Sequence, residues 1–331
     1  MRGQAEAWVR QSQLIFKVPS PDRAVRKIKN LIDILVAFKI LMCIKSNYVF
    51  IVLIICSLHS FAQEKYSFIE NFNADSLTYF RYGSTGRKSD FKWKTGVSST
   101  TETGTKVLSF KIDPDDSAGA GRGPEIIAKS FTHFGSYSAR LKVPDVKSVQ
   151  PNAGAVVGYF TYNFDNLEGL SEIDFEWLIA DPSIIYIGTW TGPKGKLKHI
   201  GRTINLAKGI IYNTSTREGY HGTELAFSGQ QNVPEKIEVL NGYDASSRFY
   251  TYGFDWLKDR ITWWMINPDT NEKIILWDYQ GSPIGIPQNE SLYRMNFWHT
   301  KDWPVIDNPA SIEKPAKPYE LAVDWMRYDG Y

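Results

Sequence analysis

The stretch Ser171–Leu178 constrains the fold of this chain more than any other segment of the sequence. Its carboxylates, Glu172, Asp174 and Glu176, alternate with one isoleucine and two aromatic residues. Alternation with period two, carried by β-branched and aromatic residues, is typical of a β-strand. Because residues two apart lie on the same face of a strand, the three acids point one way and the apolar side chains point into a core.

A row of acids on one strand face has two interpretations. An edge strand with an acidic surface is the structural one, but like charges side by side repel each other. The catalytic one places the Cα atoms of Glu172 and Glu176 about 13 Å apart, and two leaning side chains bring the carboxyls to roughly 5–6 Å, as in a retaining glycosidase. The shorter Asp174 can then hydrogen-bond a neighbour and help hold the glutamates in different protonation states.

Short runs of alternating apolar residues, separated by Gly, Asn, Asp and Pro, recur along the rest of the chain, and no segment has a long helical period. The runs are Lys106–Ile112, Ser136–Val143, Ala155–Tyr162, Ile184–Trp190, Tyr250–Trp256, Ile261–Ile266, Lys273–Trp277, Leu292–Trp298 and Leu321–Arg327. Many short strands with turn signals predict an antiparallel sandwich. A jelly roll of two curved sheets would offer a concave cleft to a chain-like ligand, and Lys194–Arg202 and Asn205–Gly242 are predicted to be long loops around it.

The N-terminal part of the chain predicts an export signal. Residues 48–58 form an apolar run that is short for a membrane span, and Ser60-Phe61-Ala62 follows it as a small-x-small cleavage site. We therefore expect residues 1–62 to be a leader, with translation starting at Met42, and residues 63–331 to be a single catalytic domain. A signal anchor that stays attached is the alternative.

Composition excludes several classes of function. The excess positive charge lies in residues 1–62 and the remainder is mildly acidic, which gives no case for nucleic-acid binding. Both cysteines, Cys43 and Cys56, fall in the predicted leader, so the exported chain would have neither disulfides nor thiol chemistry. His199, His221 and His299 lack metal-ligand spacing, and no cofactor is expected for catalysis.

The acid strand resembles the catalytic signature of glycoside hydrolase family 16, in its form without a β-bulge. That form is similar to lichenases, xyloglucan-active enzymes and fungal cell-wall transglycosylases more than to typical laminarinases. The resemblance implies a concanavalin-like jelly roll with Glu172 as nucleophile, Asp174 as assisting residue and Glu176 as acid/base. It covers about residues 66–328, through weaker matches at Phe68–Phe72, Glu125–Pro144, Arg248–Trp256, Asp259–Trp263, Met295–His299 and Glu320–Tyr328.

Sugar rings present apolar faces that stack on aromatic side chains and hydroxyls that bond to Asn, Glu and Arg. Asn296 and Trp298 share a strand face by the period-two rule, and the resemblance puts both near the cleavage point. Trp190 follows the acid strand by one turn and is a further candidate. The weaker candidates are Tyr137, Phe134 and Trp303.

Two more positions are implied by the resemblance alone. Glu125 matches a sugar contact of lichenases, although Ile127 stands where those enzymes carry an arginine, which leaves the glucan open. Asp324 matches the carboxylate of a structural calcium site on the convex face, and oxygen ligands suit calcium. An ordinary exposed aspartate is the alternative.

We expect a retaining endo-β-glycosidase, secreted or periplasmic in a bacterium or associated with its surface, acting as a monomer on a β-1,3/1,4-glucan. Once the signal is removed, neither nucleic acid nor membrane is an expected partner. The residues leave open a transglycosylase, a hydrolase of another β-glycan such as xyloglucan, laminarin or an algal galactan, and a carbohydrate-binding jelly roll without activity. Retention of all three acids argues against the last, because a lectin needs no acid/base pair.

Overall fold

The computed structural model describes residues 66–83, 90–95, 105–119, 122–280, 285–303, 305–306 and 312–331. Residues 66–331 belong to one compact unit. The predicted leader, its cleavage site and the proposed start at Met42 lie outside the described residues and stay predictions. Within the described ranges, no helix has the length and apolar character that crossing a membrane requires.

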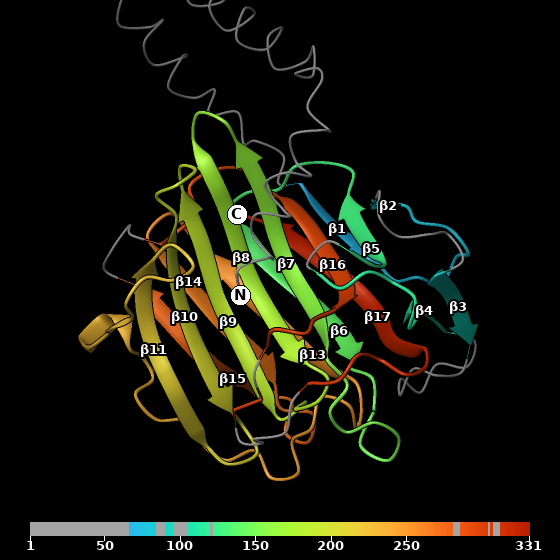
Figure 1. The fold of residues 1–331 in the computed structure, drawn as a ribbon. Helices are drawn as coiled ribbons and strands as arrows, with labels where there is room; N and C mark the ends of the chain where they lie inside the picture. The colour runs from blue at the N-terminus through green and yellow to red at the C-terminus, as the bar shows by residue number, and fades with distance from the viewer. Residues whose placement is uncertain are drawn as a thin grey trace, which may run out of the picture. The chain divides into compact units, whose positions relative to one another are not determined.

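The described strands form two antiparallel sheets (Figure 1). The front sheet runs in the order β12 (Leu225–Ala226), β11 (Ile210–Glu218), β10 (Lys198–Asn205), β9 (Ile184–Gly192), β8 (Gly169–Leu178), β7 (Ala155–Asp165), β16 (Leu292–His299), β5 (Glu125–Ala128) and β2 (Phe80–Tyr82). The back sheet runs β15 (Lys273–Gln280), β14 (Arg260–Ile266), β13 (Tyr250–Trp256), β6 (Gly135–Lys142), β17 (Tyr319–Gly330), β4 (Lys106–Ile112) and β3 (Phe91–Thr95), and β1 (Ser67–Glu70) pairs with β17.

This all-β sandwich confirms the predicted fold class. The run at Lys106–Ile112 coincides with β4, the run at Tyr250–Trp256 coincides with β13, and the other runs overlap a strand each. The predictions of long loops over Lys194–Arg202 and Asn205–Gly242 are wrong, because β10 begins inside the first range and β11 and β12 lie in the second. Asparagine, serine and arginine fill the outward positions of β11 and threonines alternate with them, so the strand has weak apolar alternation and forms by pairing with β10.

The acid strand β8 is fixed from beneath by aromatic side chains. Phe175 and Trp177 are fully buried and stack with ring centroids 5.6 Å apart and planes 10° apart. Trp177 also lies 4.7 Å from Tyr252 of the back sheet. The indole nitrogen of the buried Trp263 donates to the backbone oxygen of Asp174 at 3.1 Å. The inward face predicted for this strand is therefore confirmed, and Trp263 ties the middle of the acid row to the back sheet.

Arg202 of β10 is a buried cation between the sheets. Only 1% of the residue is exposed, and its guanidinium lies 5.4 Å from the ring of Trp277. It donates to the backbone oxygens of Pro234 and Leu276 at 2.8 and 3.0 Å and to the side chains of Thr214 and Asn232 at 2.8 and 2.6 Å. Burial lowers the pKa of Arg202 to about 9.

We expect Arg202→Met to lower the free energy of unfolding by about 3 kcal/mol or more, because two carbonyl oxygens and two side chains, each buried or partly buried, lose their donor. Denaturant unfolding measures the loss. Arg327→Met is the control, since Arg327 and Asp329 form an exposed ion pair at 2.6 Å, and its removal should cost less than about 1 kcal/mol. Equal losses in the two variants would show that the buried network of Arg202 adds nothing.

Candidate active site

Each acid of β8 has one register partner on β7 and one on β9. Glu172 lies between Tyr162 and Trp190, Asp174 lies between Phe160 and Gly188, and Glu176 lies between Gly158 and Tyr186. Because cross-strand partners share a face, every one of these side chains points away from the sandwich core. The outer acids are therefore flanked by aromatic rings, and the two glycines leave room beside the row.

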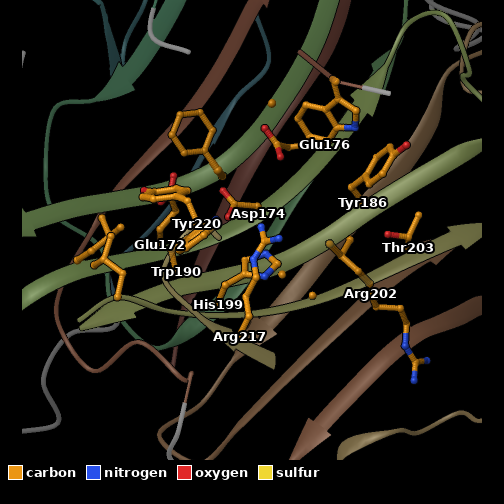
Figure 2. A pocket seen from close by; sticks show the side chains of 18 of the residues that line it. Glu172, Asp174, Glu176, Tyr186, Trp190, His199, Arg202, Thr203, Arg217 and Tyr220 are labelled. Carbon is orange, nitrogen blue, oxygen red and sulfur yellow. The ribbon is translucent and has the colours of Figure 1, made fainter. Parts of the chain in front are cut away.

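A cavity of about 380 Å³ opens over this row, and the three acids form part of its wall. Figure 2 shows their side chains along one strand, with Trp190 and Tyr220 beside Glu172 and Tyr186 on the side of Glu176. Two apolar clusters outside the core border the cavity. The first comprises Phe160, Tyr162, Phe164, Leu170 and Leu197 with Trp190 and Tyr220, and the second comprises Val156, Leu178, Trp298 and Val305 with Ala180, Tyr186, Trp303 and Ile312.

The surroundings make all three carboxyls weaker acids than usual. Burial, followed by the charge of Glu176, raises the pKa of Glu172 to about 8, and burial raises the pKa of Glu176 to about 7. Burial and then the charges of both glutamates raise the pKa of Asp174 well above its ordinary value. The row therefore holds protons near neutral pH, as general acid catalysis requires. Of the two glutamates, Glu172 has the higher pKa, so a single proton on the pair favours Glu172. For Glu172 to attack as a carboxylate, that proton has to reside on Glu176 once substrate is bound.

We expect Asp174→Asn to lower kcat/KM by less than roughly tenfold and to keep the pH profile close to that of the wild type near neutrality. The raised pKa of Asp174 favours its neutral form, and asparagine is likewise uncharged and keeps a hydrogen-bond donor. Asp174→Ala, which removes the donor, should lose more activity. If Asp174→Asn instead moved the alkaline limb by about a pH unit to lower pH, Asp174 would carry a charge that raises the pKa of its neighbours.

Arg294 of β16 is a residue of this region that the sequence reasoning missed. Its guanidinium donates to Glu125 at 3.2 Å and lies 4.9 Å from the ring of Tyr162. Its charge opposes the burial effect on the pKa of Glu172. Arg294 is also the register partner of Ile127, so it stands beside the position where the resemblance would have an arginine. Its place two residues before Asn296 on an alternating strand was the signal that could have found it.

The structure brings four of the predicted sugar contacts to the same cavity as the acids: Trp190, Asn296, Trp298 and Trp303. Trp298 is only 3% exposed, and its ring centroid lies 6.4 Å from that of Trp303. It therefore packs within the cavity wall and leaves little ring surface for a sugar. Glu125 lies opposite Asn296 in the register, is buried, and is paired with Arg294 outside the cavity lining. The contacts of these residues with sugar stay predictions.

Tyr137 and Phe134 do not line the cavity; the prediction that Tyr137 contacts sugar is wrong because the residue is fully buried, and that for the half-buried Phe134 stays a prediction. Tyr137 is fully buried in the core between the sheets and stacks on Phe254 at 4.7 Å. Phe134 packs against the same core, with its ring 3.9 Å from that of His133 and edge-on to Trp256. The register of β6 turns Tyr137 inward, and the sequence pattern alone did not fix which face of that strand is buried.

Asp324 lies at a register shift of β17 in the back sheet, away from the acid row. Its carboxylate accepts a hydrogen bond from Arg140 at 2.5 Å. The guanidinium supplies the positive charge that calcium would bring, so this carboxylate fits an ion pair better than a calcium ligand. Within the described residues, no group of three or more His, Cys, Asp or Glu side chains gathers as a metal site would require. A calcium ion at Asp324 stays a prediction.

Tyr186 and Tyr220 also line the cavity and were not foreseen. Tyr186 alternates with Gly188 and Trp190 along β9, so the period-two rule applied from Trp190 would have found it. Tyr220 follows β11 in the stretch predicted as a loop, where no residue pattern pointed to it. It stacks on Trp190 with centroids 4.4 Å apart, so one face of that predicted sugar platform is already covered.

Comparison with known proteins gives distant likenesses. No family model matches the chain. A β-glucanase of Brevibacillus brevis is 22% identical over 210 residues, which cover 62% of this chain and 59% of that protein. The solved β-glucanase of Bacillus licheniformis superposes with a TM-score of 0.49 at 18% identity, covering 81% of this chain and all of that one. A solved β-1,3-1,4-glucanase (lichenase) from a mouse hindgut metagenome superposes with a TM-score of 0.48 at 17% identity, covering 80% of this chain and 99% of that one. The chain is thus similar in sequence to a β-glucanase over part of its length.

Proposed function

We propose that this protein is an exported retaining endo-β-glycosidase that cleaves a neutral β-linked glycan, with a β-1,3/1,4-glucan as the first candidate. The observation that carries the proposal is the row of Glu172, Asp174 and Glu176 in one cavity between two apolar clusters. A binding protein would gain nothing from three carboxyls that burial makes costly to ionise. The partial likeness to a β-glucanase supports the same reading.

The reaction follows from the two glutamates. A carboxylate oxygen of Glu172 forms a bond with the anomeric carbon, and the bond from that carbon to the glycosidic oxygen breaks. Its electron pair stays on the leaving oxygen, which takes the proton of Glu176. Glu176 then accepts a proton from water, whose oxygen bonds to the anomeric carbon as the ester to Glu172 breaks. Two inversions return the original configuration.

The cavity wall gives the other residues their roles in this proposal. The apolar clusters exclude water from one side of the reacting sugar and strengthen electrostatic interactions there. The amide oxygen of Asn296 is buried and has no protein partner among the described residues, so it is available to a sugar hydroxyl. Because Gly158 separates Asn296 from Glu176 in the register, that hydroxyl would lie next to the acid/base carboxyl.

The test is product analysis of the purified protein on lichenan, xyloglucan, laminarin, agarose and carrageenan. We expect new reducing ends and short oligosaccharides from lichenan. Products longer than the substrate would instead identify a transglycosylase, in which a sugar hydroxyl replaces water and the same residues act. Binding without cleavage of any of these glycans would contradict the proposal.

A further inference from the structure

The outward face of β11 carries a polar ladder that the catalytic proposal does not use. Asn213, Ser215 and Arg217 are spaced two apart on this strand, and all three line the cavity. Glu224, just before β12, also lines it and joins them together. Its carboxylate accepts hydrogen bonds from Asn213 at 3.4 Å, Ser215 at 3.2 Å and Arg217 at 3.5 Å.

A register row connects this ladder to the acid strand. Glu172 of β8 pairs with Trp190 of β9, Trp190 with His199 of β10, and His199 with Arg217 of β11. The guanidinium of Arg217 lies 5.4 Å from the ring of Trp190. Three strand spacings separate the ends of the row, about 14 Å or roughly three hexose units. A glycan chain bound at Glu172 and extending across the sheet would therefore reach Arg217.

Two polar atoms along this row have no protein partner among the described residues although both are buried. They are Nε of Arg217 and Nδ1 of His199. Buried polar groups are nearly always hydrogen-bonded, so these two are suited to a ligand that brings its own donors and acceptors. Burial, followed by the charge of Arg217, lowers the pKa of His199 to about 3, so its ring is neutral and can both donate and accept.

The turn after β11 is built to hold the end of this row. Gly219 has a φ of 67° and donates to the backbone oxygen of Leu197 at 2.7 Å. A Cβ atom at Gly222 would lie 2.0 Å from the backbone oxygen of Glu218. Glycines at both positions thus allow the tight turn that places Tyr220 on Trp190. With that ring face covered, recognition along the row falls to its polar groups.

We propose that His199, Arg217 and Glu224 form a distal subsite for a neutral sugar unit, and that this subsite makes the enzyme prefer long chains. This inference rests on the proposed function. Arg217 and Glu224 balance each other in charge, and together they offer a donor and an acceptor side by side, which matches two neighbouring hydroxyls of a sugar ring. A sulfate or carboxylate substituent would instead meet the carboxylate of Glu224.

The test compares mixed-linkage β-glucan oligosaccharides of increasing length, from about three to seven glucose units, because the row spans roughly three hexoses. In the wild type we expect kcat/KM to rise with length until the chain reaches β11. Arg217→Met keeps an unbranched stem over Trp190 and removes the donors. For the longest oligosaccharides, this variant should have a kcat/KM roughly tenfold lower than the wild type, mainly through a higher KM, because hydrogen bonds from a charged group to the sugar are lost. Glu224→Gln, at a side chain that is 44% exposed, should remove part of the rise without risk to folding.

The matched control is Arg248→Met. Arg248 also lies 5.4 Å from an aromatic ring, that of Tyr250, and also pairs with a carboxylate, that of Asp269 at 2.9 Å, but it lies just before β13 of the back sheet and outside the cavity. This variant should keep the wild-type dependence on length.

If the wild type cleaves the oligosaccharides and both Arg217→Met and Glu224→Gln keep its full dependence on length, the subsite is wrong and the proposed function stands. If the folded wild type cleaves none, both fail. Faster cleavage of carrageenan than of neutral chains would contradict a subsite for neutral sugars.

Discussion

Glu172→Ala should lower kcat on β-glucan by at least about 10⁴-fold, because no covalent glycosyl-enzyme can form without its carboxylate. The reason is structural as well as chemical. Glu172 lies between Tyr162 and Trp190 on a strand whose other face is fixed in the core, so the backbone holds the other two acids of the row at their own positions. Initial rates from reducing-end release measure the loss, and a thermal unfolding curve close to that of the wild type excludes misfolding as its cause.

Added azide gives the same variant a diagnostic product. The space left by the carboxylate admits a small anion, which attacks the anomeric carbon once while Glu176 protonates the leaving oxygen. A single inversion of a β-glycoside yields the α-glycosyl azide. Rescue with that stereochemistry identifies Glu172 as the nucleophile. A β-glycosyl azide would instead show that another group still forms the covalent intermediate.

Glu176→Ala should lower kcat/KM on the polysaccharide by roughly 10²–10⁴-fold, the usual contribution of a general acid. On an aryl β-glycoside with an acidic phenol the first step needs no protonation, so the loss in that step should be much smaller. The ratio of the two losses is the measurement. Glu176→Gln is the companion variant, since it keeps the size of the side chain beside Tyr186 and Gly158 and removes only the titratable proton.

If Glu176→Ala lowered activity equally on the polysaccharide and on the aryl glycoside, Glu176 would not be the general acid. The wild-type pH profile gives an independent check. Burial raises the pKa of Glu176 to about 7 and that of Glu172 to about 8, and the reacting form carries one proton on this pair. Activity on the polysaccharide should therefore fall as pH rises past the higher value and the pair loses its last proton. In Glu176→Ala this alkaline limb should be absent.

The fold could be predicted from the sequence wherever one face of a strand is apolar. At β8, β13 and β16, β-branched or aromatic side chains alternate with polar ones, and burial against the other sheet enforces that pattern. The prediction failed at β11, where the outward Asn213, Ser215 and Arg217 face the cavity and leave little apolar contrast. Such a strand forms through backbone pairing with β10, which a local pattern does not show.

The same reasoning separates the site residues that were predicted from those that were not. The acids share a strand face, so spacing alone placed them together. Arg294 and Arg217 are brought there by the order of strands in the sheet, with β16 two positions from β8 and β11 three positions away on the other side. Tyr137 was a candidate sugar contact as an aromatic residue, yet its face of β6 is turned into the core. Sheet order and strand facing are long-range properties, which a single sequence does not supply.

The central claim, a double displacement by Glu172 and Glu176, is tested most directly by the configuration of the first product. Proton NMR of wild-type protein acting on a soluble mixed-linkage β-glucan resolves the α and β anomeric protons before mutarotation mixes them. The account predicts that the β anomer appears first and that the α anomer grows in later at the rate of mutarotation. Appearance of the α anomer first would mean a single displacement by water, with the carboxyls farther apart than about 5.5 Å, and would contradict the retaining mechanism.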